Sequence, residues 1–104
     1  MENPRIDALR KLIDRNPDDP RLRFGLAAEY EKLGLWEQVV AELREYLARA
    51  EDEGNAWGRL GNALRQLGRD DEAREAYRTG IQAANRHGHP GMAAEFEMIL
   101  EEMA

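Results

Sequence analysis

One pattern of apolar and small residues occurs twice in this chain, and the two copies lie 34 residues apart in the sequence. The corresponding positions are Leu26 and Leu60, Ala27 and Gly61, Tyr30 and Leu64, Gly34 and Gly68, and Leu43 and Tyr77. In each copy a small residue stands where two helices can touch, and a glycine stands where the chain turns. A repeat of this length with these features is typical of helical arrays. The pattern therefore predicts an all-α protein.

The spacing of apolar residues and turn signals predicts six helices and no convincing strand. Asn3 and Pro4 suit the start of the first helix, as a capping residue followed by the first helical residue. The later helices are expected at about 20–33, 36–50 and 55–67, then from Asp70 or Asp71 onward, and from Pro90 onward. One of those two aspartates is expected to cap the fifth helix. The acidic segment 51–54 is interpreted as a solvated connector.

The second copy carries the more specific motif, Trp57-x-x-Leu60-Gly61-x-x-Leu64 followed by Gly68, Ala73 and Tyr77. This motif resembles the tetratricopeptide repeat family, in which each unit is a pair of antiparallel helices. The resemblance implies an α-α superhelix, or solenoid, whose inner helices line a concave face. On that pattern the whole chain, 1–104, is a single domain. It comprises an N-terminal half-repeat helix (1–19), a first repeat (20–53), a second repeat (54–87) and a C-terminal capping helix (88–104).

The other parts of the chain depart from the family pattern. In the first repeat, Arg23 stands where the family usually has tryptophan, and Val39 stands where it has alanine. In the last helix, a strict step of 34 residues places Glu95 at the site of close helix contact. A shift of two residues places Phe96 and Leu100 inward instead. We expect the shifted register, because it buries apolar side chains worth roughly 1.5–3 kcal/mol each.

Composition narrows the classes of function. The net charge of −6 argues against nucleic-acid binding, which requires clustered basic residues. The chain has no cysteine and no serine, which excludes thiol and serine nucleophiles, and it has no Gly-Lys-Ser/Thr sequence for a phosphate-binding loop. Catalysis is therefore not expected. No signal peptide or membrane span is recognisable, which favours the cytoplasm. Lys11 and Lys32 are the only lysines, and this arginine bias suggests a GC-rich bacterial genome.

The resemblance also implies a function, because family members typically bind an extended peptide or a partner helix on the concave face. Helical spacing places four polar residues of the second repeat on one face, with Arg65 beside them. These residues are Asn55, Arg59, Asn62, Arg65 and Gln66. The segment 54–69 contains three arginines and no acid, which favours an acidic peptide or a terminal carboxylate as ligand. The alternative is a solvated face whose arginines pair with carboxylates of neighbouring helices.

Phe24 and Ala28 would add an apolar floor to this surface. They occupy positions where some family members carry a basic clamp for a chaperone's terminal carboxylate, and Arg59 replaces the clamp's asparagine. The clamp is therefore not reproduced. Phe24 can equally be interpreted as packing against the first helix.

The last helix is the alternative interaction surface, because it carries more apolar side chains than one packing face requires. Met92, Phe96, Ile99 and Met103 would then assemble a structural homo-oligomer. His87 and His89 have a spacing that can chelate a metal, but no third ligand is evident, so neither a metal nor a cofactor is expected. The paired acids are interpreted as helix caps and polar surface rather than as catalytic groups.

Overall fold

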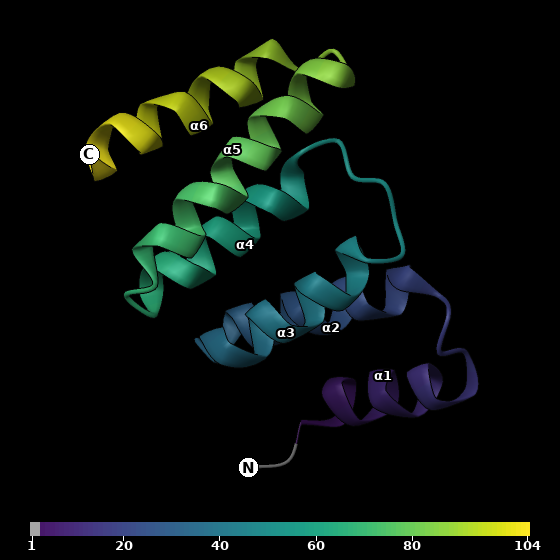
Figure 1. Cartoon of the computed structure of the whole chain (residues 1–104). Helices are drawn as coiled ribbons and strands as arrows, with labels where there is room; N and C mark the ends of the chain where they lie inside the picture. Colours follow the sequence, from purple (N-terminus) through teal and green to yellow (C-terminus); the bar gives the residue numbers. More distant parts are fainter. Residues whose placement is uncertain (1–2) are drawn as a thin grey trace. The chain divides into compact units, whose positions relative to one another are not determined.

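The structure is a computed structural model that describes residues 3–104. These residues form six helices and no strand (Figure 1): α1 Pro4–Arg15, α2 Pro20–Lys32, α3 Trp36–Leu47, α4 Asn55–Gln66, α5 Asp70–Arg86 and α6 Pro90–Met103. The all-α class predicted from the repeat is therefore confirmed. No helix among the described residues combines the length and the apolar character that crossing a membrane requires.

The chain divides into two compact units, one ending at Ala50 and the other spanning Glu51–Ala104. In the first unit α2 packs against α1 and against α3, and in the second α5 packs against α4 and against α6. Helices that follow one another within a unit run antiparallel (Figure 1). Antiparallel helix pairs are thus present, as the family pattern implies. The division of the chain into repeats at 20–53 and 54–87 stays a prediction.

Several helix ends follow from local sequence chemistry. The side chain of Asn3 accepts hydrogen bonds from the backbone N–H groups of Arg5 and Ile6, at 3.1 and 3.2 Å, as a capping residue should. Asp19 accepts one from the N–H of Arg21 at 3.0 Å and begins α2 in the same way. Gly34 and Gly68 have φ angles of 69° and 74°, a left-handed conformation that favours glycine. These predicted caps and turns are confirmed.

Two predictions about acidic segments were wrong. The residue before α5 is Arg69, and no side chain caps that helix, because Asp70 and Asp71 already lie in its first turn. Their carboxylates still suit the positive end of the helix dipole. The segment 51–54 is not simply solvated, because Asp52 is 4% exposed. A buried carboxylate needs hydrogen-bond donors, and Asp52 finds them at the start of α4.

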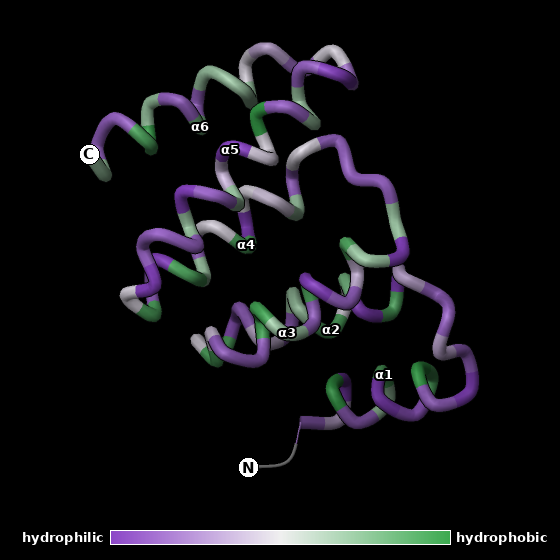
Figure 2. The backbone as a smooth tube through the Cα atoms, viewed as in Figure 1, coloured by the Kyte–Doolittle hydropathy of each residue, from purple (hydrophilic) through white to green (hydrophobic). Residues whose placement is uncertain are grey.

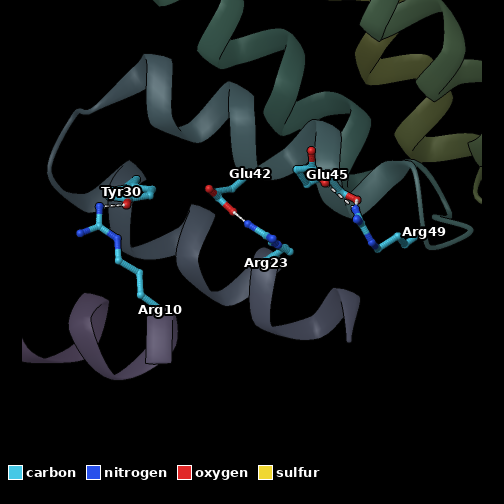
Figure 3. A network of polar contacts seen from close by, with 6 residues as sticks. All are labelled: Arg10, Arg23, Tyr30, Glu42, Glu45 and Arg49. Atoms are coloured by element: carbon cyan, nitrogen blue, oxygen red, sulfur yellow. Dashed lines mark hydrogen bonds and ion pairs between the residues drawn. The ribbon is translucent and has the colours of Figure 1, made fainter. Parts of the chain in front are cut away.

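The first unit combines an apolar core with polar contacts between its helices. Its fully buried side chains come mainly from α2 and α3: Leu26, Ala27, Val39 and Leu43. Figure 2 shows how hydrophobic and hydrophilic stretches alternate along these helices. Arg23, at the family's tryptophan position, pairs instead with Glu42 of α3 at 3.0 Å (Figure 3). Figure 3 also shows Arg10 of α1 donating to the hydroxyl of Tyr30, which links α1 to α2.

The second unit is built on close approaches at glycines. A Cβ atom at Gly61 would lie 2.8 Å from the ring of Tyr77, so α4 and α5 touch at this point through the absence of a side chain. This confirms the predicted contact at the small residue. In α6, Phe96 is buried and Glu95 is exposed, so the shifted register is confirmed for Phe96.

Candidate functional site: the polar face of α4

The start of α4 is fixed by the carboxylate of Asp52. Its Oδ2 accepts hydrogen bonds from the backbone N–H groups of Gly54 and Ala56, at 2.9 and 2.8 Å. Gly54 immediately precedes α4 and Ala56 lies in its first turn, where an α-helix has no internal partners for its N–H donors. A negative charge there is also favoured by the helix dipole. Asp52 therefore anchors the helix that carries the candidate site.

Helical spacing places four of the predicted polar residues of α4 along one side of the helix, and Arg65 lies at the edge of that side, one turn after Gly61. Asn55, Arg65 and Gln66 are exposed, and Arg59 and Asn62 are half-buried. The opposite side of α4 packs into the second unit through Leu60, Gly61 and Leu64, all of them buried. A single helix thus presents two guanidinium groups and three amides together. Asn55–Gln66 contains no carboxylate of its own.

Arg65 has a defined partner that sequence reasoning missed. Its guanidinium donates a hydrogen bond to the hydroxyl of Tyr77, a residue of α5 that is 2% exposed. Burial raises the pKa of the Tyr77 phenol above 10.0, and the hydrogen bond from Arg65 opposes that rise. Gly61, one helical turn before Arg65, was the available signal, because the tyrosine ring lies against it and Arg65 stands above it.

The charge of Arg65 is not neutralised by a carboxylate among residues 3–104. Many other arginines are neutralised in this way: Arg5 by Glu29, Arg21 by Asp19, Arg23 by Glu42, Arg49 by Glu45, Arg69 by Glu72, Arg74 by Asp71 and Arg78 by Glu75. Arg65 instead uses a neutral phenol as its partner. The face of α4 therefore keeps an exposed positive charge in a chain that is acidic as a whole.

Phe24 and Ala28 belong to α2, in the unit that ends at Ala50. Both are half-buried. The ring of Phe24 packs on that of Tyr46 in α3, with centroids 4.9 Å apart and planes inclined by 53°. The aromatic partner of Phe24 is thus on α3, whereas the alternative interpretation had Phe24 packing against the first helix. The prediction that Phe24 and Ala28 line a peptide-binding surface stays a prediction.

The predicted oligomer surface on α6 is not arranged as expected, because Phe96 points into the second unit. The residue is 8% exposed, and its ring packs against that of Tyr77 in a tilted arrangement with centroids 5.6 Å apart. Met92 also faces inward, because a Cβ atom built at Gly54 would lie only 2.8 Å from the Sδ atom of Met92. Ile99 and Met103 are half-buried. Met98, at 62%, is the exposed large apolar side chain of α6, and the predicted surface had omitted it.

The histidine pair lies at the end of the second unit. Nε2 of His87 lies 3.7 Å from a carboxylate oxygen of Glu51, which joins the end of α5 to the segment before α4. His89 immediately precedes α6. Across residues 3–104, no three histidine, aspartate or glutamate side chains gather as metal ligands.

Antiparallel helix pairs, with glycines at the close contacts of the second unit and a polar helix face left outside the core, define a helical repeat protein. A sequence model of the tetratricopeptide repeat matches residues 1–84. The chain therefore belongs to the tetratricopeptide repeat family.

Individual relatives agree with this assignment. The chain is 31% identical over 96 residues to small glutamine-rich tetratricopeptide repeat-containing protein 2 of Mycosarcoma maydis, and the match covers 90% of this chain but 27% of that protein. It is 28% identical to the TPR repeat-containing protein PA0015 of Pseudomonas aeruginosa, with 94% and 93% of the two chains covered. Among solved structures, protein BPP2914 from Bordetella parapertussis is similar, with a TM-score of 0.79 and 25% identity, over 99% of this chain and 89% of that one.

Proposed function

We propose that this chain is a non-enzymatic protein-interaction module that binds an acidic extended peptide or partner helix on the polar face of α4. Tetratricopeptide repeats generally mediate contacts between proteins, and the membership of this chain supports an interaction role. A family alone does not identify a ligand, so the chemistry of the surface has to provide the specificity.

The observation that carries the proposal is the uncompensated charge of Arg65 on an exposed helix face that has no carboxylate of its own. A guanidinium binds a carboxylate through two parallel N–H donors, which gives both attraction and orientation. Asn55, Asn62 and Gln66 would add amide donors and acceptors for the backbone of the bound segment. Together these groups fit a ligand that offers carboxylates and backbone carbonyls rather than phosphate or metal.

Affinity capture from an extract of the source organism tests this proposal. The native protein is compared with a variant in which Arg59, Asn62 and Arg65 are all changed to alanine. The matched control changes Arg78, Gln82 and Arg86 to alanine, which removes two arginines and one amide from the exposed side of α5. Circular dichroism and thermal melting verify that each variant is folded, because Arg65→Ala also leaves the buried Tyr77 hydroxyl without its donor.

We expect a partner that the native protein and the α5 control retain and that the α4 variant loses. Its contact segment should be rich in aspartate and glutamate, and raising the salt concentration should weaken capture, because exposed charges are screened. Equal capture by the α4 variant would exclude the polar face of α4 as the binding surface.

A second candidate function is self-assembly through the outer side of α6, and the exposure of Met98 favours it. Sedimentation equilibrium over a range of protein concentrations separates the two functions. A mass that rises with concentration, and that falls to the monomer value in Met98→Glu, would support self-assembly. A monomer mass throughout would leave the peptide-binding module as the remaining candidate.

A further inference from the structure

Tyr77 holds the one polar atom of its side chain at the edge of the polar face of α4. The residue is 2% exposed, and its ring lies so close to Gly61 that a Cβ there would be 2.8 Å away. Residues four apart stand above one another on a helix, so Arg65 rises directly over Gly61 and toward the phenol. The hydroxyl accepts the hydrogen bond from Arg65, and it is not among the buried polar atoms of the described residues that lack a partner.

The ring of Tyr77 is itself held from the other side. The ring of Phe96 in α6 packs against it in a tilted arrangement, with centroids 5.6 Å apart and planes inclined by 54°. The phenol therefore cannot swing away without disturbing the packing of α4, α5 and α6, since close-packed interiors leave little room for side-chain movement. The buried hydroxyl of Tyr77 therefore holds the exposed guanidinium of Arg65 in one orientation.

An arginine with one N–H bound in this way still has other donors that face solvent, because its guanidinium carries five N–H groups in a fixed fork. A free arginine side chain loses most of its rotamer freedom when it binds, whereas one that is already oriented loses less. The contact also leaves the positive charge intact, which a carboxylate partner would not.

We propose, on the basis of the function proposed above, that Tyr77 is a positioning residue that pre-orients Arg65 to receive a carboxylate of the bound acidic segment. Recognition at the face of α4 then depends on a side chain of α5 that no ligand touches. The partner's carboxylate meets Arg65 in a direction set by the Tyr77 hydroxyl. The bound segment must therefore place an aspartate, glutamate or terminal carboxylate opposite the last turn of α4.

A double-mutant cycle with a defined probe tests this role. Fluorescein-labelled hexaglutamate is titrated by anisotropy at low salt against the native protein, Tyr77→Phe, Arg65→Ala and the double variant. Hexaglutamine and hexalysine peptides of the same length serve as controls. Tyr77→Phe keeps the ring and its packing and removes the hydroxyl alone. We expect it to weaken hexaglutamate binding about threefold to tenfold, the range for one hydrogen bond. In the Arg65→Ala background the same change should have no further effect.

Two outcomes would overturn the proposal while the function of the α4 face stands. One is an unchanged affinity of Tyr77→Phe, and the other is an equal loss in the presence and absence of Arg65, which would indicate a general structural effect. If the native protein does not prefer hexaglutamate over hexaglutamine, both this inference and the acidic ligand fail. The capture experiment distinguishes failure of the Tyr77 role from failure of the binding face. If the α4 triple variant loses the captured partner, the face of α4 is still the binding surface.

A second measurement needs no ligand. Nuclear magnetic relaxation of the guanidinium groups should show Arg65 to be more ordered than Arg86, which is exposed and has no partner among the described residues. The order of Arg65 should fall to that of Arg86 in Tyr77→Phe. Equal mobility of the two arginines in the native protein would contradict a pre-oriented Arg65.

Discussion

The ring of Phe96 fills the space where a side chain at Gly58 would begin. A Cβ atom built at Gly58 would lie 2.5 Å from Cζ of Phe96 and 2.6 Å from its Cε1. The same ring meets Gly80 of α5, where a Cβ would lie 2.9 Å from Cε2. Helix α6 is thus seated against α4 and α5 by one aromatic side chain in a recess made by two glycines.

We expect Gly58→Ala to destabilise the protein. An extra methyl group in a packed core costs about 1–3 kcal/mol, and the short contact places this site at the upper end. Alanine's better helix propensity returns only about 1 kcal/mol. Gly91→Ala in α6 is the matched control, because nothing lies within 4 Å of a Cβ there. Urea unfolding should show a lower midpoint for Gly58→Ala and an unchanged or higher one for Gly91→Ala; equal midpoints would contradict the packing.

The carboxylate of Asp52 should contribute measurably to the stability of the second unit. Asp52→Ala leaves two N–H groups at the start of α4 without their acceptor, and loss of a capping side chain costs about 0.5–2 kcal/mol. Glu51→Ala removes a neighbouring exposed carboxylate whose contact is the long one with His87, at 3.7 Å, so it should change stability by no more than about 0.5 kcal/mol. Thermal melts of the two variants decide the matter. If both changes have the same small effect, Asp52 does not anchor α4.

Stability should fall in acid partly because of Glu29. This carboxylate is 6% exposed and lies 2.9 Å from Nζ of Lys32 and 3.1 Å from Nε of Arg5. The hydrogen bond from Lys32, followed by the charge of Arg5, lowers the pKa of Glu29 below 4.5. Its contribution is therefore complete above that pH and is lost as the pH falls through the lowered pKa.

Denaturant unfolding between about pH 7 and about pH 3 measures this contribution. Glu29→Gln should be less stable than the native protein at neutral pH and should lose less stability on acidification. The exposed Glu102, which has no ion pair among the described residues, provides the control Glu102→Gln. If Glu29→Gln loses as much stability on acidification as the native protein does, then other carboxyl groups account for the acid dependence of stability.

Alkaline pH should destabilise the fold through Tyr77. Because burial raises the pKa of its phenol in the folded state above 10.0, the unfolded chain ionises first as the pH rises. The associated stability is present below about pH 10 and is lost as the pH rises toward the raised pKa. Tyr77→Phe should remove this loss, and Tyr46→Phe should retain it. Unfolding curves at alkaline pH that are identical for native protein and Tyr77→Phe would contradict a buried phenol.

Local signals in the sequence were sufficient for much of the fold. Asn3 before proline, Gly34 and Gly68 at turns, and Gly61 at a helix contact each act through backbone geometry or a short-range cap, so their roles could be predicted from neighbouring residues. Phe96 could be placed because burying its ring outweighs keeping a strict repeat length.

The remaining features depend on residues that are distant in the sequence. From its acidic neighbours Asp52 is expected to be solvated. It is buried because its carboxylate accepts hydrogen bonds at the start of α4, which the sequence does not show. Arg65 and Tyr77 lie on different helices, and the repeat pattern does not specify which polar atoms meet there. The polar stripe on α4 was predictable from helical spacing, whereas the partner of each arginine required the packed structure.

Mapping the partner's contact on α4 tests the central claim most directly. Amide hydrogen exchange is followed in the native protein alone and in complex with the captured partner. The account predicts that protection increases along residues 55–66, and that it does not increase there in the α4 triple variant. Protection confined to α1 or to the outer side of α6, with residues 55–66 unchanged, would contradict it.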